Sequence, residues 1–236
     1  MRIAIIPARG GSKRIKDKNI VDFCGKPMIS YALEAARASG LFDVIHVSTD
    51  SERIAAVADD LGFPVAFLRD PSMAGDHTPL MPVLRWVLER FRDSGREASD
   101  VCLLMPCAPL VEAEDLRGAY DAYARSGREI PLLAVVSFPY PVERALALDS
   151  EGVLRPKYPD SWHARSQDLA PAYHDAGLFS FSPAAHIMNP ALVVADRLLP
   201  YRLPRYKGVD IDEPEDLELA EMIYRGWHAM RKAAEE

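Results

Sequence analysis

Short apolar runs alternate along the chain with longer segments in which apolar residues recur every three or four positions. Strands are predicted for residues 3–7, 44–47, 65–68, 100–106, 132–137 and 177–182. Helices are predicted for residues 27–39, 54–61, 80–91, 115–123 and 214–230. Strands that alternate with helices of this length are typical of an α/β fold, a mainly parallel sheet between two helical layers. Ligands of such folds bind beyond the carboxyl ends of the strands.

The alternation breaks between residues 138 and 172, where prolines, aromatic residues and short alternating runs are mixed. Residues 145–148 and 153–155 flank the turn sequence "DSEG" and fit a β-hairpin. An isolated hairpin is marginally stable in water, so we expect it to pack against another surface, such as a second subunit. The sequence therefore predicts a single domain over residues 1–236 with an inserted β-rich arm at 138–172.

Charge and composition restrict the classes of partner. The 236 residues include 28 Lys and Arg against 35 Asp and Glu, a net charge of -7. Nucleic acids and anionic membranes bind proteins through excess positive charge, so we expect neither as a partner. No apolar stretch approaches the roughly 20 residues of a membrane span. Three cysteines without metal or redox spacing favour a reducing compartment, and the cytoplasm is expected.

Positive charge is nevertheless concentrated near the N-terminus, in the stretch "ARGGSKRIKDKN" that follows the first strand. Glycines there allow backbone amides to turn toward a ligand, and the lysines can neutralise an anion. The stretch matches neither the P-loop nor the dinucleotide fingerprint. A solvated basic loop and a phosphate-binding loop both fit, and the position after a strand favours phosphate binding.

An acidic motif, "VDIDEPEDLELA", lies near the other end of the chain. If the backbone is extended, Asp210 and Asp212 project from one face and offer two hard oxygen ligands suited to Mg²⁺. The same stretch fits a helix start, with Asp212 as N-cap and further acids in the first turn. Both readings can hold together. The basic and acidic motifs combined offer what nucleotidyl transfer needs, cations for a triphosphate and carboxylates for its metal.

Five motifs of the sequence resemble those of a known enzyme family. "IPARGGSKRIKDKN", "LFDVIHVSTD", "LRDPSMAGDHTP", "RSQDLAPAYHDAG" and "DIDEPEDLELAE" lie in order over nearly the whole chain. They resemble the cytidylyltransferases that activate nine-carbon sialic-type acids, and the fourth motif is most similar to the pseudaminic acid branch. The resemblance implies a Rossmann-like fold of the nucleotide-diphospho-sugar transferase type. It also implies homodimers in which an arm of one subunit helps close the other's site.

The implied reaction transfers CMP from CTP to the anomeric hydroxyl of an acid sugar, with Mg²⁺ as cofactor and pyrophosphate as the second product. The resemblance assigns nucleotide binding to Arg9, Gly10, Gly11, Ser12, Lys13, Lys18, Asn19, Arg69 and Asp76. It assigns the sugar to Arg165, Gln167, Tyr173 and Asp175, Mg²⁺ to Asp210 and Asp212, and catalysis to Lys13, Lys18 and Asp210. A guanidinium binds a carboxylate through a two-point fork, so Arg165 is the candidate for the carboxylate of the sugar.

The chain departs from the family pattern at two places. Met105 begins the sequence "MPCAP", where family members often have a polar residue, and Asp175 stands where the sialic acid enzymes commonly have Asn. Legionaminic acid, neuraminic acid and the eight-carbon Kdo stay open as alternative substrates. A catalytically silent nucleotide-binding regulatory protein is the alternative of another class, although the retained aspartates speak against it. The general base also stays open, with His174, the metal aspartates and a metal-bound water as candidates.

Overall fold

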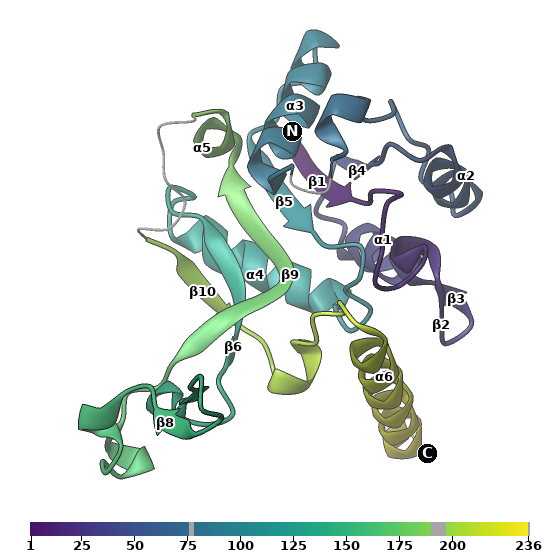
Figure 1. Cartoon of the computed structure of the whole chain (residues 1–236). Helices are drawn as coiled ribbons and strands as arrows, with labels where there is room; N and C mark the ends of the chain where they lie inside the picture. The colour runs from purple at the N-terminus through teal and green to yellow at the C-terminus, as the bar shows by residue number, and fades with distance from the viewer. Residues whose placement is uncertain (76–77, 190–196, 236) are drawn as a thin grey trace.

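The computed structural model describes residues 1–75, 78–189 and 197–235, and its main sheet has the strand order β10-β6-β9-β5-β1-β4 (Figure 1). The strands are β1 (Arg2–Pro7), β4 (Val44–Ser48), β5 (Asp100–Leu104), β6 (Leu132–Ser137), β9 (Tyr173–Pro183) and β10 (Leu199–Arg202). β1 runs parallel to β4 and β5, and β10 runs parallel to β6. β9 is antiparallel to both of its neighbours, β5 and β6. The predicted mainly parallel sheet is confirmed.

Helices cover both faces of this sheet. The α-helices are α1 (Met28–Ser39), α2 (Glu52–Asp60), α3 (Leu80–Asp93), α4 (Ala113–Arg125), α5 (Ala184–Met188) and α6 (Pro214–Glu235). Ala4 and Ile6 of β1 pack in the cluster that includes α1, α2 and α4, whereas Ile3 and Ile5 pack with α3 and α5. Successive strand residues point to opposite faces, so this alternation produces the three-layer α/β architecture that the sequence predicted.

Short elements connect the layers. The 3-10 helices are η1 (Lys18–Ile20), η2 (Pro71–Met73), η3 (Val142–Arg144), η4 (Pro159–Ser161), η5 (Ser166–Asp168) and η6 (Arg205–Lys207). A two-stranded hairpin, β2 (Asp22–Phe23) with β3 (Lys26–Pro27), precedes α1. Phe23 of this hairpin, Tyr31 of α1 and Tyr224 of α6 pack edge to face on one another. This aromatic contact holds the middle of the C-terminal helix against the N-terminal part of the fold. Among the described residues, no helix has the length and apolarity needed to cross a membrane.

The parallel strands place their carboxyl ends at one edge of the sheet. Residues 8–17 follow β1, residues 49–51 follow β4, and residues 105–112 follow β5. The antiparallel β9 begins at the same edge, because Tyr173 pairs with Ser137, the last residue of β6. Residues 203–213 return to this edge after β10. Segments that lie far apart in the sequence are therefore brought together where ligands of α/β folds bind.

The inserted arm extends away from the main sheet (Figure 1). Its hairpin pairs β7 (Leu146–Leu148) with β8 (Leu154–Pro156), which confirms the predicted hairpin. Leu148 and Leu154 are 68% and 58% exposed. Apolar side chains this exposed on a two-stranded hairpin are expected to pack on another surface, and the second subunit stays a prediction.

The strand predicted for residues 65–68 is wrong. This segment forms bends rather than a strand after α2. Phe67 turns onto the rings of His46, 4.5 Å away between ring centroids, and Phe91. Leu68 is 43% exposed. Phe67 in this run therefore belongs to a local aromatic cluster. The apolar pattern of the sequence does not distinguish such a cluster from a strand.

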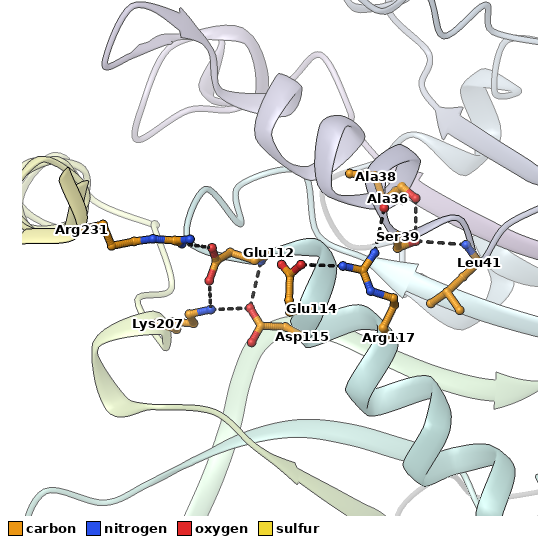
Figure 2. A network of polar contacts seen from close by, with 10 residues as sticks. All are labelled: Ala36, Ala38, Ser39, Leu41, Glu112, Glu114, Asp115, Arg117, Lys207 and Arg231. Carbon is orange, nitrogen blue, oxygen red and sulfur yellow. Dashed lines mark hydrogen bonds and ion pairs between the residues drawn. The ribbon is translucent and has the colours of Figure 1, made fainter. Parts of the chain in front are cut away.

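A buried lysine joins the segment after β10 to α4 (Figure 2). Lys207 is 4% exposed, and its Nζ lies 2.8 Å from Glu112 Oε2 and 2.5 Å from Asp115 Oδ2. Glu112 and Asp115 form the capping box of α4, and Arg231 of α6 reaches Glu112 Oε1 at 2.6 Å. The network holds α4, η6 and α6 together, and so positions the intervening residues 208–213.

Replacing Lys207 by methionine should lower the free energy of unfolding by about 3–5 kcal/mol, because it leaves two carboxylates without their buried cation. Burial lowers the pKa of Lys207, but hydrogen bonds and charges of Asp115 and Glu112 more than offset this and raise it above the ordinary value. The stabilisation is thus present at neutral pH and disappears only as the pH rises through that alkaline pKa.

Urea unfolding of the Lys207→Met variant measures this effect, and Arg231→Met is the matched control. Arg231 has a side chain that is 53% exposed and pairs with the same Glu112. Loss of this exposed pair should cost about 1 kcal/mol or less. Equal losses for the two variants would contradict the role assigned to the buried lysine.

Candidate active site

The basic loop after β1 is held close to the start of α2. The Gly10 amide donates to Asp50 Oδ1 at 3.1 Å. A Cβ atom at Gly10 would lie 3.0 Å from the Ser51 Cβ, so a larger residue would push the loop away. The Gly10 amide is thus already engaged with Asp50, while Gly11 and Lys13 are exposed on the same loop.

Asn19 connects this loop to the segment after β5. Its side chain is 5% exposed, and its Nδ2 donates to the Arg9 carbonyl at 2.9 Å. The Cys107 thiol donates to Asn19 Oδ1 at 3.5 Å. Burial raises the pKa of Cys107 to about 12, so the thiol keeps the proton that this contact needs. The Asn19 carboxamide therefore has a fixed orientation.

Arg69 supplies a buried positive charge beside the loop. It is 6% exposed, and its Nε donates to Ser48 Oγ at 3.1 Å, while a second guanidinium nitrogen donates to the Ser48 carbonyl. Burial lowers the pKa of Arg69 from its ordinary value, although an arginine remains charged at neutral pH. Asp76, which was predicted to bind the nucleotide together with Arg69, lies outside the described residues.

A first cavity of about 190 Å³ opens between these segments. Arg9, Ser12, Asn19 and Arg69 line it, together with Pro7, Gly75, Thr78, Leu80, Val83, Met105 and Pro106. Four residues of the predicted nucleotide-binding set thus surround one cavity at the carboxyl edge of the sheet. Its positive side chains and amide groups suit an anionic ligand.

The acidic motif meets the basic loop directly. Lys18 Nζ donates to the Ile211 carbonyl at 2.6 Å and to Asp212 Oδ1 at 3.0 Å. Arg14 forms an ion pair with Asp212 Oδ2 at 3.0 Å. Hydrogen bonds from Lys18 are the largest cause that holds the pKa of Asp212 below its ordinary value. The two motifs that the sequence places at opposite ends of the chain therefore share one edge of the fold.

Asp212 does not cap α6, so that part of the prediction is wrong. The carboxylate of Asp216 accepts the amides of Asp212 and Glu213 at 2.9 and 2.7 Å. Asp216 reaches back from the first helical turn, which leaves the Asp212 carboxylate free to face Lys18 and Arg14. The predicted acidic first turn is confirmed by Glu215 and Asp216.

Asp210 lies on the other side of Ile211, which is fully buried and anchors the segment. Within the described part of the chain, the Asp210 carboxylate has no hydrogen bond or ion pair. Burial raises its pKa, and the charge of Asp212 adds to the effect. Its Cγ would lie 3.1 Å from a Cβ atom at Gly177, where φ is +67°, so both space and backbone conformation require glycine there.

The two aspartates fit a Mg²⁺ site chemically. They are hard oxygen ligands, and a cation near Asp210 would offset the burial and the charge of Asp212 that raise its pKa. In residues 1–75, 78–189 and 197–235, no group of three or more His, Cys, Asp or Glu side chains could hold a metal. Mg²⁺ is usually bound by one or two carboxylates, with phosphates and waters as its other ligands, so two aspartates suffice.

A second cavity of about 160 Å³ adjoins the first and shares Leu80 and Met105 with it. Its other lining residues are Leu103, Leu133, Asp175, Gly177, Leu178, Phe179, Ser180 and Asp210. Asp175 Oδ1 accepts the Gly177 amide at 2.8 Å. Of the residues predicted to bind the sugar, Asp175 is thus the one placed beside Asp210.

The remaining predicted sugar-binding residues lie elsewhere in this chain. Arg165 is on the arm, with its side chain 73% exposed and paired with Asp168 at 2.7 Å. Gln167 lies in η5 of the same arm, and Tyr173 stands under the guanidinium of Arg202. None of the three lines either cavity. Arg165 and Gln167 could reach such a site if the arm met another copy of the chain.

Sequence reasoning missed several residues of this edge. Arg14 belongs to the basic stretch, and its position three residues after a glycine pair gave no sign that it would meet Asp212. Leu80 and Met105 form the boundary between the cavities; the sequence singled out Met105 only as a departure from the family pattern and gave no sign that it would meet Leu80 of α3. A hydrophobic residue at a helix start or strand end is ordinary, so no local signal identifies such a boundary.

Comparison with known proteins gives concordant results. The family model described as cytidylyltransferase matches residues 3–129. The pseudaminic acid cytidylyltransferase of Campylobacter jejuni is 37% identical over 96% of this chain and 97% of its own length. A Helicobacter pylori protein is 30% identical over 77% of this chain and 34% of its own length. It is named pseudaminic acid cytidylyltransferase and UDP-2,4-diacetamido-2,4,6-trideoxy-beta-L-altropyranose hydrolase.

Among solved structures, the CMP:2-keto-3-deoxy-manno-octonic acid synthetase complexed with CTP is similar with a TM-score of 0.70. The two chains share 16% sequence identity, and the match covers 95% of this chain and 98% of the other. At this identity the likeness establishes the shared fold.

Proposed function

The chain belongs to the cytidylyltransferase family, and we propose that it transfers CMP from CTP to the anomeric hydroxyl of pseudaminic acid. The observation that carries this proposal is the contact between Lys18 and Asp212. It joins a basic loop suited to a triphosphate and a pair of aspartates suited to its metal, beside two adjoining cavities. One cavity would hold the cytidine nucleotide and the other the acid sugar.

In this reaction the anomeric oxygen bonds to the α-phosphorus of CTP while the bond to the β-phosphate oxygen breaks. Pyrophosphate leaves with the electrons of the broken P–O bond, and the proton of the hydroxyl is released to water. Arg9, Lys13 and Lys18 would offset the charge of the phosphates, and Asn19 would orient the nucleotide through its fixed carboxamide. Catalysis would come mainly from positioning and charge stabilisation. Asp210 and Asp212 would hold Mg²⁺, which supplies further charge neutralisation at the phosphates when bound.

The sugar assignment is supported by the names of the relatives. The C. jejuni relative is a pseudaminic acid cytidylyltransferase over nearly its full length. The second activity named for the H. pylori relative concerns a diacetamido sugar without oxygen at C6, whose terminal carbon is therefore a methyl group. We expect the acid sugar of the present chain to share this chemistry: two acylamino groups and a methyl end.

The proposed assembly is a cytoplasmic homodimer in which the arm of one subunit brings Arg165 and Gln167 to the site of the other. Exposed Leu148, Leu154 and Tyr140 on the arm support such a contact. Sedimentation of the purified chain distinguishes a dimer from a monomer, and a monomer at assay concentration would leave these two residues without a role at the site.

Pyrophosphate release tests the proposed reaction. The purified chain is incubated with Mg²⁺ and with CTP, UTP or GTP, together with pseudaminic, legionaminic or N-acetylneuraminic acid. The expected result is release that needs both CTP and an acid, with pseudaminic acid as the best substrate. Release with no acid of the panel, or equal use of the three nucleotides, would overturn the proposal.

A further inference from the structure

We infer that Met105 sets the sugar preference of the enzyme, because it gives the second cavity an apolar wall that accepts a methyl-ended acid and disfavours a hydroxylated one. This inference deepens the proposed function and rests on it. The acid favoured by this wall belongs to the class of deoxygenated acylamino sugar acids. The stereochemistry of the ring carbons is a separate property.

The position of the second cavity identifies its occupant. Nucleotidyl transfer requires the attacking hydroxyl to stand in line with the α-phosphorus, on the side opposite the leaving group. The acceptor must therefore occupy a space that adjoins the nucleotide. The second cavity meets this condition, because it shares Leu80 and Met105 with the first and contains Asp210.

The second cavity has apolar residues on one part of its wall and polar residues on another. Leu80 of α3, Leu103 of β5, Met105 and Leu133 of β6 form an apolar side. These four residues offer no hydrogen bond of ordinary strength, because the thioether of methionine is only a weak acceptor. A hydroxyl group placed against them would lose its water without gaining a partner, and that is unfavourable. A methyl group would instead gain from burial.

The polar side chains of the cavity are the carboxylates of Asp175 and Asp210, which accept, and the hydroxyl of Ser180, which accepts and donates. Asp175 uses Oδ1 for the Gly177 amide, and its second oxygen has no hydrogen bond within the described part of the chain. An ionised carboxylate only accepts, so an acylamino N–H is a suitable partner for this oxygen. The cavity therefore combines an acceptor for an acylamino group with a wall for a methyl group.

Met105 lines both cavities, and a hydrogen bond of its backbone holds it in place. Its amide donates to the Leu178 carbonyl at 2.8 Å, which continues the pairing of β5 with β9 beyond Leu104. Glutamine has nearly the same length and could replace methionine without a change in this backbone contact. The Met105→Gln variant would place a hydrogen-bonding amide at the boundary, where it could serve a hydroxyl.

The test uses two acceptors that differ only at the terminal carbon, one a methyl and one a hydroxymethyl group, with CTP saturating. An apolar pocket rejects an added hydroxyl by about 100-fold in kcat/KM, so the wild-type enzyme should prefer the methyl-ended acid by that order. The Met105→Gln variant should reduce the preference to about 10-fold or less, mainly through the KM of the two acids. A wild-type ratio near one, or an unchanged ratio in the variant, would overturn the inference.

Met81→Gln is the matched control. Met81 is the second residue of α3 and packs against the hydrophobic cluster on that side of the sheet. It lines neither cavity, so the preference of the variant between the two acids should stay at the wild-type value. If Met105→Gln does not fold, as judged by thermal unfolding, Leu133→Gln tests the same wall from β6. Turnover of neither acid would refute the proposed function itself, and this outcome is distinct from turnover with equal preference.

Discussion

Replacing Lys13 by alanine is expected to lower kcat for CMP transfer by about 10²–10³-fold, because a preorganised charge at a developing anion commonly contributes about 2.7–4 kcal/mol. Lys13 lies on the exposed part of the basic loop, between the segment held by Asp50 and the contact of Lys18 with Asp212. Charge on the phosphates grows as pyrophosphate leaves. A cation on this loop therefore stabilises the transition state more than bound CTP, and kcat should fall more than the KM for CTP rises.

Steady-state kinetics with CTP and acid varied separately measure this effect, and Lys16→Ala is the matched control. Lys16 is an exposed lysine of the same loop, so its removal changes the net charge equally. The control should retain kcat within a few-fold, because exposed charges away from the phosphates are largely screened. Similar losses in both variants would show that general loop charge, rather than the position of Lys13, matters.

Replacing Asp210 by asparagine is expected to raise the Mg²⁺ concentration needed for half-maximal activity by at least about 10-fold. Even the partners of metal ligands typically contribute 10–100-fold to metal affinity. The metal-free variant should also unfold at a higher temperature than the metal-free wild type at neutral pH. Burial and the charge of Asp212 raise the pKa of Asp210, so its ionised form destabilises the folded state.

A carboxyl group with a raised pKa in the folded state holds its proton more firmly there than in the unfolded chain. Its ionisation therefore reduces stability as the pH rises above its ordinary pKa, and Asp210→Asn removes that loss. Thermal unfolding with and without Mg²⁺ measures it independently of turnover. Glu218→Gln, at an exposed acid of α6 beyond the first turn, is the control and should change neither property. An unchanged Mg²⁺ requirement in Asp210→Asn would move the metal site elsewhere.

Much of the fold could be predicted because its signals are local. The alternation of strands and helices, the end of α1 at Gly40 and the arm hairpin follow from periodicity and turn residues in short windows. Residues 65–68 could not be assigned, because an apolar run beside a helix looks the same in a strand and in an aromatic cluster. The role of Asp212 was misassigned for a similar reason: an Asp before an acidic first turn fits an N-cap, and the sequence does not show that Lys18 and Arg14 bind its carboxylate.

The candidate site was predictable where its chemistry is unusual. A basic loop in an acidic chain and two aspartates around an apolar residue stand out, and the structure brings them within 3.0 Å through Lys18 and Asp212. The apolar boundary of Leu80 and Met105 was not predictable, because it arises only when α3 and β5 pack. Arg165 and Gln167 lie on the arm and away from both cavities, so their proposed role depends on a second subunit.

The central claim is that the anomeric oxygen of the acid attacks the α-phosphorus of CTP. The most direct test supplies pseudaminic acid labelled with ¹⁸O at the anomeric hydroxyl and determines the products by mass spectrometry. The account predicts CMP-pseudaminic acid that keeps the label in the oxygen between sugar and phosphorus, together with unlabelled pyrophosphate. Unlabelled CMP-sugar, label in the pyrophosphate, or release of CMP without a sugar adduct would contradict it.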